Sequence, residues 1–239
     1  MSKNHFQSIA GVFAAILLLM QSSPSTAANY SETLSAIKQG LLDAPLAGTS
    51  RTNALEALAD TARAFVKANP ERAEALVWEG IVLAELSAAR RNMSSLSLAK
   101  KSRGNFEAAE KMDPGALDWS VYSLLAYLYA NVPRWPIGFG DKERALELHR
   151  HALALNPASA EPHRYYGEFL IDEGKFTEAV GELDLALSAP LRAGDRDTGS
   201  GSVCNARQCM KYTEQTDGAF RAEVRAERAE ALKRAKRIS

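Results

Sequence analysis

The chain has 239 residues, 46% of them hydrophobic and 24% charged, and its 29 basic side chains balance 29 acidic ones. This length and composition are typical of a globular protein with one or two domains and a substantial core. Because the formal net charge is zero, no global field attracts nucleic acid, and we expect no nucleic-acid partner. Frequent alanine and sparse β-branched residues in the long segments favour helices over strands.

Residues 1–28 have the order of a secretory signal peptide. Lys3 gives a weakly basic start, an uncharged apolar run follows over 11–20, and the residues up to Ala28 are small and polar. The run is well short of the roughly 20 residues that span a bilayer. We therefore expect cleavage after Ala27 or Ala28, export to the periplasm and no stable membrane span, with an uncleaved anchor as the alternative.

The following segment reads as a series of helices separated by short breaks. Thr52 or Asn53 is expected to cap the second helix, Pro70 to open the third at its first position, and Asp141 to cap the sixth. Apolar side chains recur at helical spacing over 30–42, 53–69, 70–90, 96–112, 116–130 and 141–155.

An irregular insert interrupts this series at residues 131–140. Its two prolines and two glycines exclude a regular helix. Trp135 and Phe139 in this insert are either exposed contacts or a lid packed on the helices. We expect packing, because the two prolines stiffen the loop.

Residues 158–173 and 175–188 form the clearest helical hairpin. The break between them falls at Gly174, which suits a left-handed residue at a helix C-terminus. Gly167 on the first helix is expected to let the second helix approach closely, with Leu183 filling the gap. Gly80 and Phe106 repeat this arrangement in an earlier pair of helices.

Four prolines each close a helical segment, and their spacing indicates a repeat. They are separated by 44, 43 and 33 residues, and the last value is close to the roughly 34-residue period of tetratricopeptide repeats. The longer units fit the same hairpin with about ten extra residues, which are visible as the insert in one of them. These prolines are Pro70, Pro114, Pro157 and Pro190.

These residues resemble the tetratricopeptide repeat family over about 50–190. The resemblance implies an all-α fold, an antiparallel helix-hairpin stack (an α-solenoid) over 29–190, because each hairpin leaves an apolar face that stacking must bury. It also implies a concave groove, lined by the first helix of each hairpin, that holds an extended peptide or a partner helix. By position, the groove would be lined by Arg164, Glu168, Ile171 and Asp172, extended by Ser120, Leu124 and Tyr127 and then by Val77 and Ile81. The alternative for several of these side chains is core between repeats.

The chain is also similar to small exported bacterial repeat proteins that carry the pattern seen at 132–141. A weaker resemblance is to the periplasmic accessory subunit of TRAP-type solute transporters, which has a helical repeat body. Members of that type are usually lipid-anchored, and this chain lacks the cysteine that such an anchor needs.

Beyond Pro190 the composition changes. Residues 191–217 read as a linker that carries Cys204 and Cys209. In an oxidising compartment this pair is a candidate disulfide, with two free thiols as the alternative, and it supplies too few ligands for a metal site. Residues 218–239 read as a basic helix that is expected to cap the last repeat.

No motif in the chain indicates a metal or cofactor site, and we expect no catalytic site. Glu168 and Asp172 are one helical turn apart, and a paired-acid catalytic site is the alternative to the solvated or peptide-facing patch that we expect there. His149 and His163 occupy packing positions, and His151 is expected to be exposed. The leading hypothesis is a non-enzymatic periplasmic scaffold that binds a protein or peptide in its groove. The alternatives are an accessory subunit of a solute transporter, which binds a small ligand or its binding protein, and, third, an enzyme.

Overall fold

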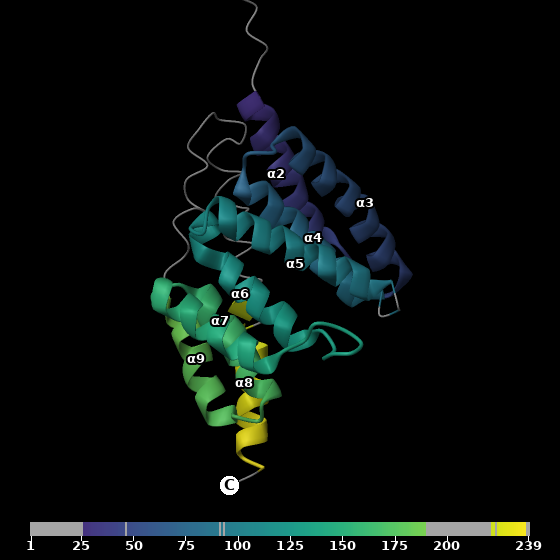
Figure 1. The fold of residues 1–239 in the computed structure, drawn as a ribbon. Coiled ribbons are helices and arrows are strands. Elements are labelled where there is room, and N and C mark those ends of the chain that lie inside the picture. Colours follow the sequence, from purple (N-terminus) through teal and green to yellow (C-terminus); the bar gives the residue numbers. More distant parts are fainter. Residues whose placement is uncertain are drawn as a thin grey trace, which may run out of the picture.

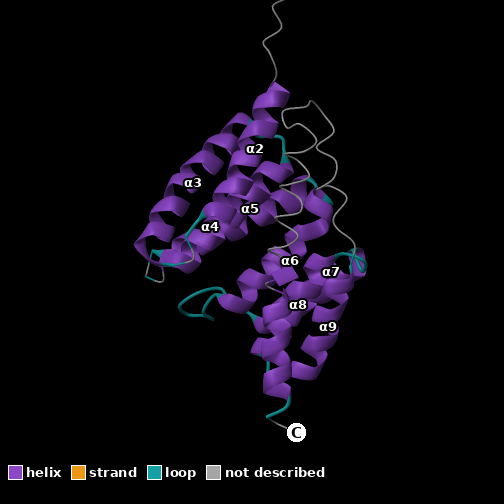
Figure 2. Cartoon of the chain, turned by 180° about the vertical axis from the view of Figure 1, so that it is seen from behind, coloured by secondary structure: helices purple, strands orange, loops and turns teal. Residues whose placement is uncertain are grey.

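A computed structural model describes residues 26–45, 47–90, 92, 94–189, 221, 222 and 224–237, and over these residues the chain consists of helices and loops without a strand (Figure 2). Residues 1–25 of the expected signal peptide and the linker with Cys204 and Cys209 lie outside the described residues. The helices are α2 (Thr26–Asp43), α3 (Gly48–Ala68), α4 (Ala73–Arg90), α5 (Ser95–Met112), α6 (Ala116–Asn131), α7 (Lys142–Leu155), α8 (Ala160–Asp172) and α9 (Phe176–Ser188).

Consecutive helices pack against each other as hairpins, and the hairpins stack (Figure 1). The pairs are α2 with α3, α4 with α5, α6 with α7 and α8 with α9. The first helices of three successive pairs also meet, since α6 packs against both α4 and α8. The core is continuous through α4, which contributes Val77 to one apolar cluster and Leu83 to the next. The predicted all-α hairpin stack is confirmed.

Three turns that contain a proline connect the hairpins, and each has the same backbone hydrogen-bond pattern. In each turn the carbonyl of the residue before the proline accepts the N–H three residues later. The bonds run from Arg72 to Asn69 (3.1 Å), from Ala116 to Asp113 (3.1 Å) and from Ser159 to Asn156 (3.2 Å). Pro70 therefore lies in a turn and α4 begins only at Ala73, so the expectation that Pro70 opens the helix was wrong. The fixed φ of proline suits the second position of such a turn.

Two glycines bring paired helices together as predicted. A Cβ added to Gly167 would lie 2.8 Å from Cγ of Leu183, so α8 and α9 meet where the first has no side chain. A Cβ on Gly80 would lie 2.4 Å from Cε1 of Phe106, which gives α4 and α5 the same close approach. Both predicted glycine contacts are confirmed.

The helix ends confirm two of the expected caps and correct a third. Oδ1 of Asp141 accepts two N–H groups of the first turn of α7, each at 3.0 Å. Gly174 has φ of 74°, as expected of a left-handed residue after α8. The helix α3 begins at Gly48, before Thr52 and Asn53, so neither residue caps it. Glycine tolerates the φ of 82° at the start of this helix. The added residues before Asn53 carry no apolar side chain and none is buried, so apolar spacing did not reveal them.

The first turn of α6 is left-handed. Leu117, Asp118 and Trp119 have φ of 50°, 55° and 62°. Each of these side chains costs about 1–2 kcal/mol in this conformation, because its Cβ approaches the following carbonyl oxygen. The regular helix therefore starts after a strained turn.

The insert between α6 and α7 projects from the stack as a loop (Figures 1 and 2). Phe139 packs edge-on against Tyr129, with the two ring centroids 5.6 Å apart. The guanidinium carbon of Arg103 lies 4.3 Å from the centroid of the Phe139 ring. Trp135 is 85% exposed, so the packing prediction holds for Phe139 and was wrong for Trp135. A Cβ on Gly140 would lie 1.8 Å from the carbonyl oxygen of Val132, and this close return of the chain turns the tip away from the helices.

A C-terminal helix over residues 221, 222 and 224–235 (yellow in Figure 1) packs on the last hairpin. Val224 and Ala231 are fully buried against apolar side chains of α8 and α9. It runs antiparallel to α9, since Arg221 donates to the carbonyls of Leu187 and Ala189 while Arg234 lies over Phe176. It thereby covers the open end of the stack, as expected of a capping helix.

No helix in the described ranges is long and apolar enough to cross a membrane.

Candidate functional site

Two tyrosines meet where α6 packs against α8. The rings of Tyr127 and Tyr165 approach edge-on, with centroids 5.8 Å apart and planes inclined by 60°. Both side chains are half-buried, so their apolar faces pack while part of each remains accessible. Edge-on aromatic pairs are favourable because the positive edge of one ring meets the negative face of the other.

The charges of carboxylates on two neighbouring helices act on Tyr127. Burial, followed by the negative charges of Glu168 on α8 and Glu85 on α4, raises the pKa of Tyr127 to about 12. Asp172 acts in the same direction, and Arg164 opposes it. Charged side chains of α4 and α8 therefore act on one phenol of α6.

The second tyrosine has a similar environment. Burial is the main cause that raises the pKa of Tyr165, and the charges of Glu161 and Glu168 add to it. Arg164 again lowers it, and its guanidinium carbon lies 5.7 Å from the Tyr165 ring centroid. The group that we call the tyrosine–carboxylate cluster consists of Glu85, Tyr127, Tyr165, Glu168 and Asp172.

The two phenols of this cluster are poorly suited to proton transfer near pH 7. With their pKa values raised, both phenols stay neutral near pH 7 and are far from the range in which a side chain exchanges protons efficiently. They offer aromatic edges and hydroxyl groups, and the carboxylates offer acceptors and negative charge. This combination suits a partner segment that carries N–H donors or cationic side chains.

Of the nine residues predicted for the groove, the structure brings Tyr127, Glu168 and Asp172 to this cluster. Arg164 and Ile171 face the C-terminal helix, and Arg164 also borders Tyr165. Arg164 forms an ion pair with Glu227 at 3.0 Å, and Ile171 packs against the buried cluster that contains Val224. The C-terminal helix thus covers one side of α8 beside the cluster.

The extension of the predicted groove along α6 and α4 is mostly core. Ser120, Leu124 and Val77 are only 5%, 8% and 0% exposed, so they pack between the helices. Ile81 is half-buried against the same core. The alternative that these positions form core between repeats is the one observed.

The sequence reasoning missed Glu85 and Tyr165. Glu85 lies one helical turn after Ile81, and Tyr165 lies three residues before Glu168, so each shares a helix face with a predicted residue. Extending each predicted face by one turn in both directions would have found them.

The three histidines of the described part of the chain have different environments. His149 is 1% exposed between Tyr166 and Phe169, at 5.6 and 5.1 Å between ring centroids, and neither ring nitrogen has a hydrogen-bond partner. Burial lowers its pKa to about 4. His151 is exposed and lies edge-on to Tyr122. The predicted packing role of His149 and exposure of His151 are confirmed.

His163 is buried as predicted and has two polar partners as well. Its Nδ1 lies 2.7 Å from a carboxylate oxygen of Glu182, and its Nε2 lies 2.9 Å from the carbonyl oxygen of Pro157. The hydrogen bond to Glu182 is the main cause that raises the pKa of His163. This contact ties α8 to α9 and to the turn before α8.

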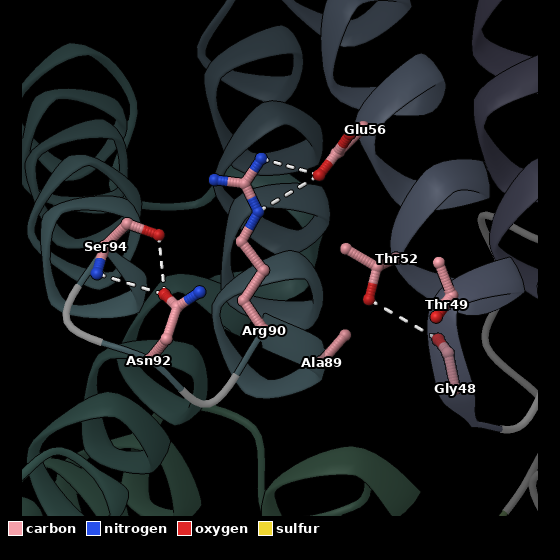
Figure 3. A pocket seen from close by; sticks show the side chains of 8 residues that line it. All are labelled: Gly48, Thr49, Thr52, Glu56, Ala89, Arg90, Asn92 and Ser94. Carbon is pink, nitrogen blue, oxygen red and sulfur yellow. Dashed lines mark hydrogen bonds and ion pairs between the residues drawn. The ribbon is translucent and has the colours of Figure 1, made fainter.

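A polar hollow lies between the start of α3 and the end of α4 (Figure 3). Arg90 donates from Nε and Nη2 to one oxygen of Glu56, at 3.2 and 2.6 Å, so its charge is paired. Asn92 accepts from the backbone N–H and the hydroxyl of Ser94. The hollow is open to solvent, and the polar groups named here form hydrogen bonds with one another rather than pointing together at a site for a ligand.

Among the residues that the structure describes, no group of three or more His, Cys, Asp or Glu side chains is arranged to hold a metal ion. A scan against protein-family models and a search of curated proteins both find no match to the chain.

Proposed function

We propose that the chain is a non-enzymatic, tetratricopeptide-like scaffold of the periplasm that binds a protein or an extended peptide over the tyrosine–carboxylate cluster. The observation that carries the proposal is the edge-on contact of Tyr127 with Tyr165 where α6 packs against α8. The negative charges of Glu85, Glu168 and Asp172, from the hairpins on either side, act on the Tyr127 phenol. A surface built from several repeats suits an extended partner, because successive hairpins contact successive parts of it.

The composition of the cluster supports a protein partner. Tyrosine is enriched at the centres of protein interfaces, where its ring contributes apolar area and its hydroxyl contributes a hydrogen bond. The carboxylates favour a partner segment with lysine or arginine, since complementary charge speeds association and fixes register. Residues 1–28, with the order of a signal peptide, support the periplasmic location.

The test is affinity capture from periplasmic extract with the full chain as bait, followed by mass spectrometry. We expect a protein that is retained by the wild type and about tenfold less by Asp172→Lys, because Asp172 is exposed and its charge acts on Tyr127. Glu178→Lys is the matched control, since it reverses an exposed carboxylate on α9. Recovery of small molecules alone, or equal loss in both variants, would contradict the proposal.

A further inference from the structure

The tip of the insert between α6 and α7 exposes two large apolar side chains that are separated by one residue in the sequence. Trp135 is 85% exposed and Ile137 is 65% exposed, and Pro136 between them is exposed as well. Among the other large hydrophobic side chains in the described ranges, none is more than 50% exposed. An apolar tip of this kind on a projecting loop is typical of an interaction site.

The loop holds its tip in place by contacts at its base. The N–H of Gly140 donates to the carbonyl of Pro133 at 2.9 Å, and the N–H of Asp141 donates to the carbonyl of Tyr129 at 2.8 Å. Phe139 is fixed between Tyr129 and Arg103. The tip is therefore exposed because these contacts fix the conformation of the loop.

Few backbone N–H groups at the tip depend on water for a hydrogen bond. Proline has no N–H, which removes the donors of Pro133 and Pro136. The N–H groups of Ile137 and Gly138 both donate to the carbonyl of Arg134, at 3.2 and 3.1 Å. A segment that enters an apolar environment must satisfy such groups internally, and this tip does so for both residues that follow Pro136.

Basic side chains flank the tip. Arg134 precedes Trp135 and is exposed. On α5, the side chain of Leu96 lies within 3.3 Å of the Cβ position of Gly138, and the exposed Lys100 follows Leu96 by one helical turn. The carboxylate that ends the loop, Asp141, is engaged in capping α7. Arg134 thus places a positive charge directly beside the tip, and Lys100 adds one on the helix that contacts the base of the loop.

We propose that this loop inserts Trp135 and Ile137 into the interfacial region of an anionic lipid bilayer. Tryptophan is favoured at this depth, where its ring meets the acyl chains and its N–H reaches the headgroups. Arg134 and Lys100 attract the anionic headgroups around the tip. A protruding apolar tip enters a bilayer without a complementary pocket, whereas a protein partner would have to supply one.

The experiment uses vesicles of phosphatidylcholine with phosphatidylglycerol and the full chain in two forms that retain one tryptophan each. The variant Trp78→Phe/Trp119→Phe keeps Trp135, and Trp78→Phe/Trp135→Phe keeps Trp119 as the matched reporter. We expect the emission of Trp135 to shift to shorter wavelength on binding and to be quenched by brominated acyl chains. The emission of Trp119 should change little, even if the apolar run at 11–20 anchors the chain.

Two further variants measure the contribution of the tip to binding. Ile137→Asp should lower the partition coefficient on these vesicles roughly tenfold, because an apolar side chain that leaves water is replaced by a charge. Leu185→Asp, which changes a half-exposed leucine on α9, should leave it unchanged. Vesicles of phosphatidylcholine alone should bind more weakly.

Three results would overturn the proposal. One is unshifted and unquenched Trp135 emission on vesicle-bound protein, and another is an equal loss of binding in Ile137→Asp and Leu185→Asp. The third is a Trp135 shift that appears with periplasmic protein and not with vesicles, which would assign the tip to a protein partner.

Discussion

Acid should loosen the contact between α7 and α8 through His149. This side chain is 1% exposed between two aromatic rings and has no hydrogen-bond partner at either nitrogen, so the fold holds it neutral. The pKa of His149 is about 4 in the folded chain against 6.5 for an ordinary histidine. The unfolded chain therefore binds the proton first as the pH falls, and stability is lost between about pH 6.5 and about pH 4.

The magnitude follows from the two pKa values. A difference of about 2.5 units corresponds to a ceiling of about 3.4 kcal/mol, at about 1.36 kcal/mol per unit. Between about pH 7.5 and about pH 4.5, the linkage relation gives a loss of about 2.5 kcal/mol from this residue. His163 acts in the opposite direction, because its raised pKa adds stability at low pH that is lost as the pH rises. A variant that changes His149 alone is needed to separate the two.

The assay is urea denaturation at the two pH values, followed by circular dichroism, for the wild type and His149→Phe. Phenylalanine keeps an aromatic ring in the site and does not titrate. We expect the wild type to lose about 2.5 kcal/mol more than His149→Phe on acidification. Parallel losses in the two proteins would refute the account, and His149→Leu provides a second non-titrating comparison if the larger ring disturbs the packing.

Three further predictions concern the stack and its cap. Gly167→Ala should lower the free energy of unfolding by about 1–3 kcal/mol, because the added Cβ would lie 2.8 Å from the facing leucine of α9. Gly181→Ala, whose added Cβ would have no atom within 4 Å, should raise the free energy of unfolding by up to about 1 kcal/mol. A gain in stability in both variants would contradict the packing. Asp118→Gly should stabilise the chain by about 1 kcal/mol in thermal unfolding, since glycine tolerates its φ of 55°, and a loss of stability would contradict the expected relief of strain. Glu227→Arg should speed hydrogen exchange in the C-terminal helix by removing the partner of Arg164, and Arg164→Glu in the same chain should restore slow exchange; failure of this charge swap would argue against the pairing.

The stacked fold could be predicted because its signals are local. Apolar spacing identified the helices, and the residues before Pro70, Pro114 and Pro157 end their helices in the same turn. The pair Gly167 and Leu183 was recognisable because one hairpin places them opposite each other, only a few turns apart in the sequence. Where polar residues extend a helix, as before Asn53 on α3, the apolar pattern gave a boundary that was too late.

The candidate site was only partly predictable because it depends on distant contacts. Whether a groove-facing residue on the first helix of a hairpin is buried or accessible depends on how closely the hairpins stack. Leu124 is buried between the helices, whereas Tyr127 is only half-buried. The ion pair of Arg164 with Glu227 joins residues more than 60 positions apart. The exposure of Trp135 depends on the path of the loop around Gly140, which composition does not specify.

A photo-crosslinking experiment tests most directly the claim that the tyrosine–carboxylate cluster binds a partner. Benzoylphenylalanine is introduced at Tyr127, within the cluster, or at Arg150, an exposed position on α7, and the full chain is irradiated in periplasmic extract. The proposal predicts a discrete crosslinked protein from position 127 and none from position 150. Crosslinks from position 150 alone, or the same products from both positions, would contradict it.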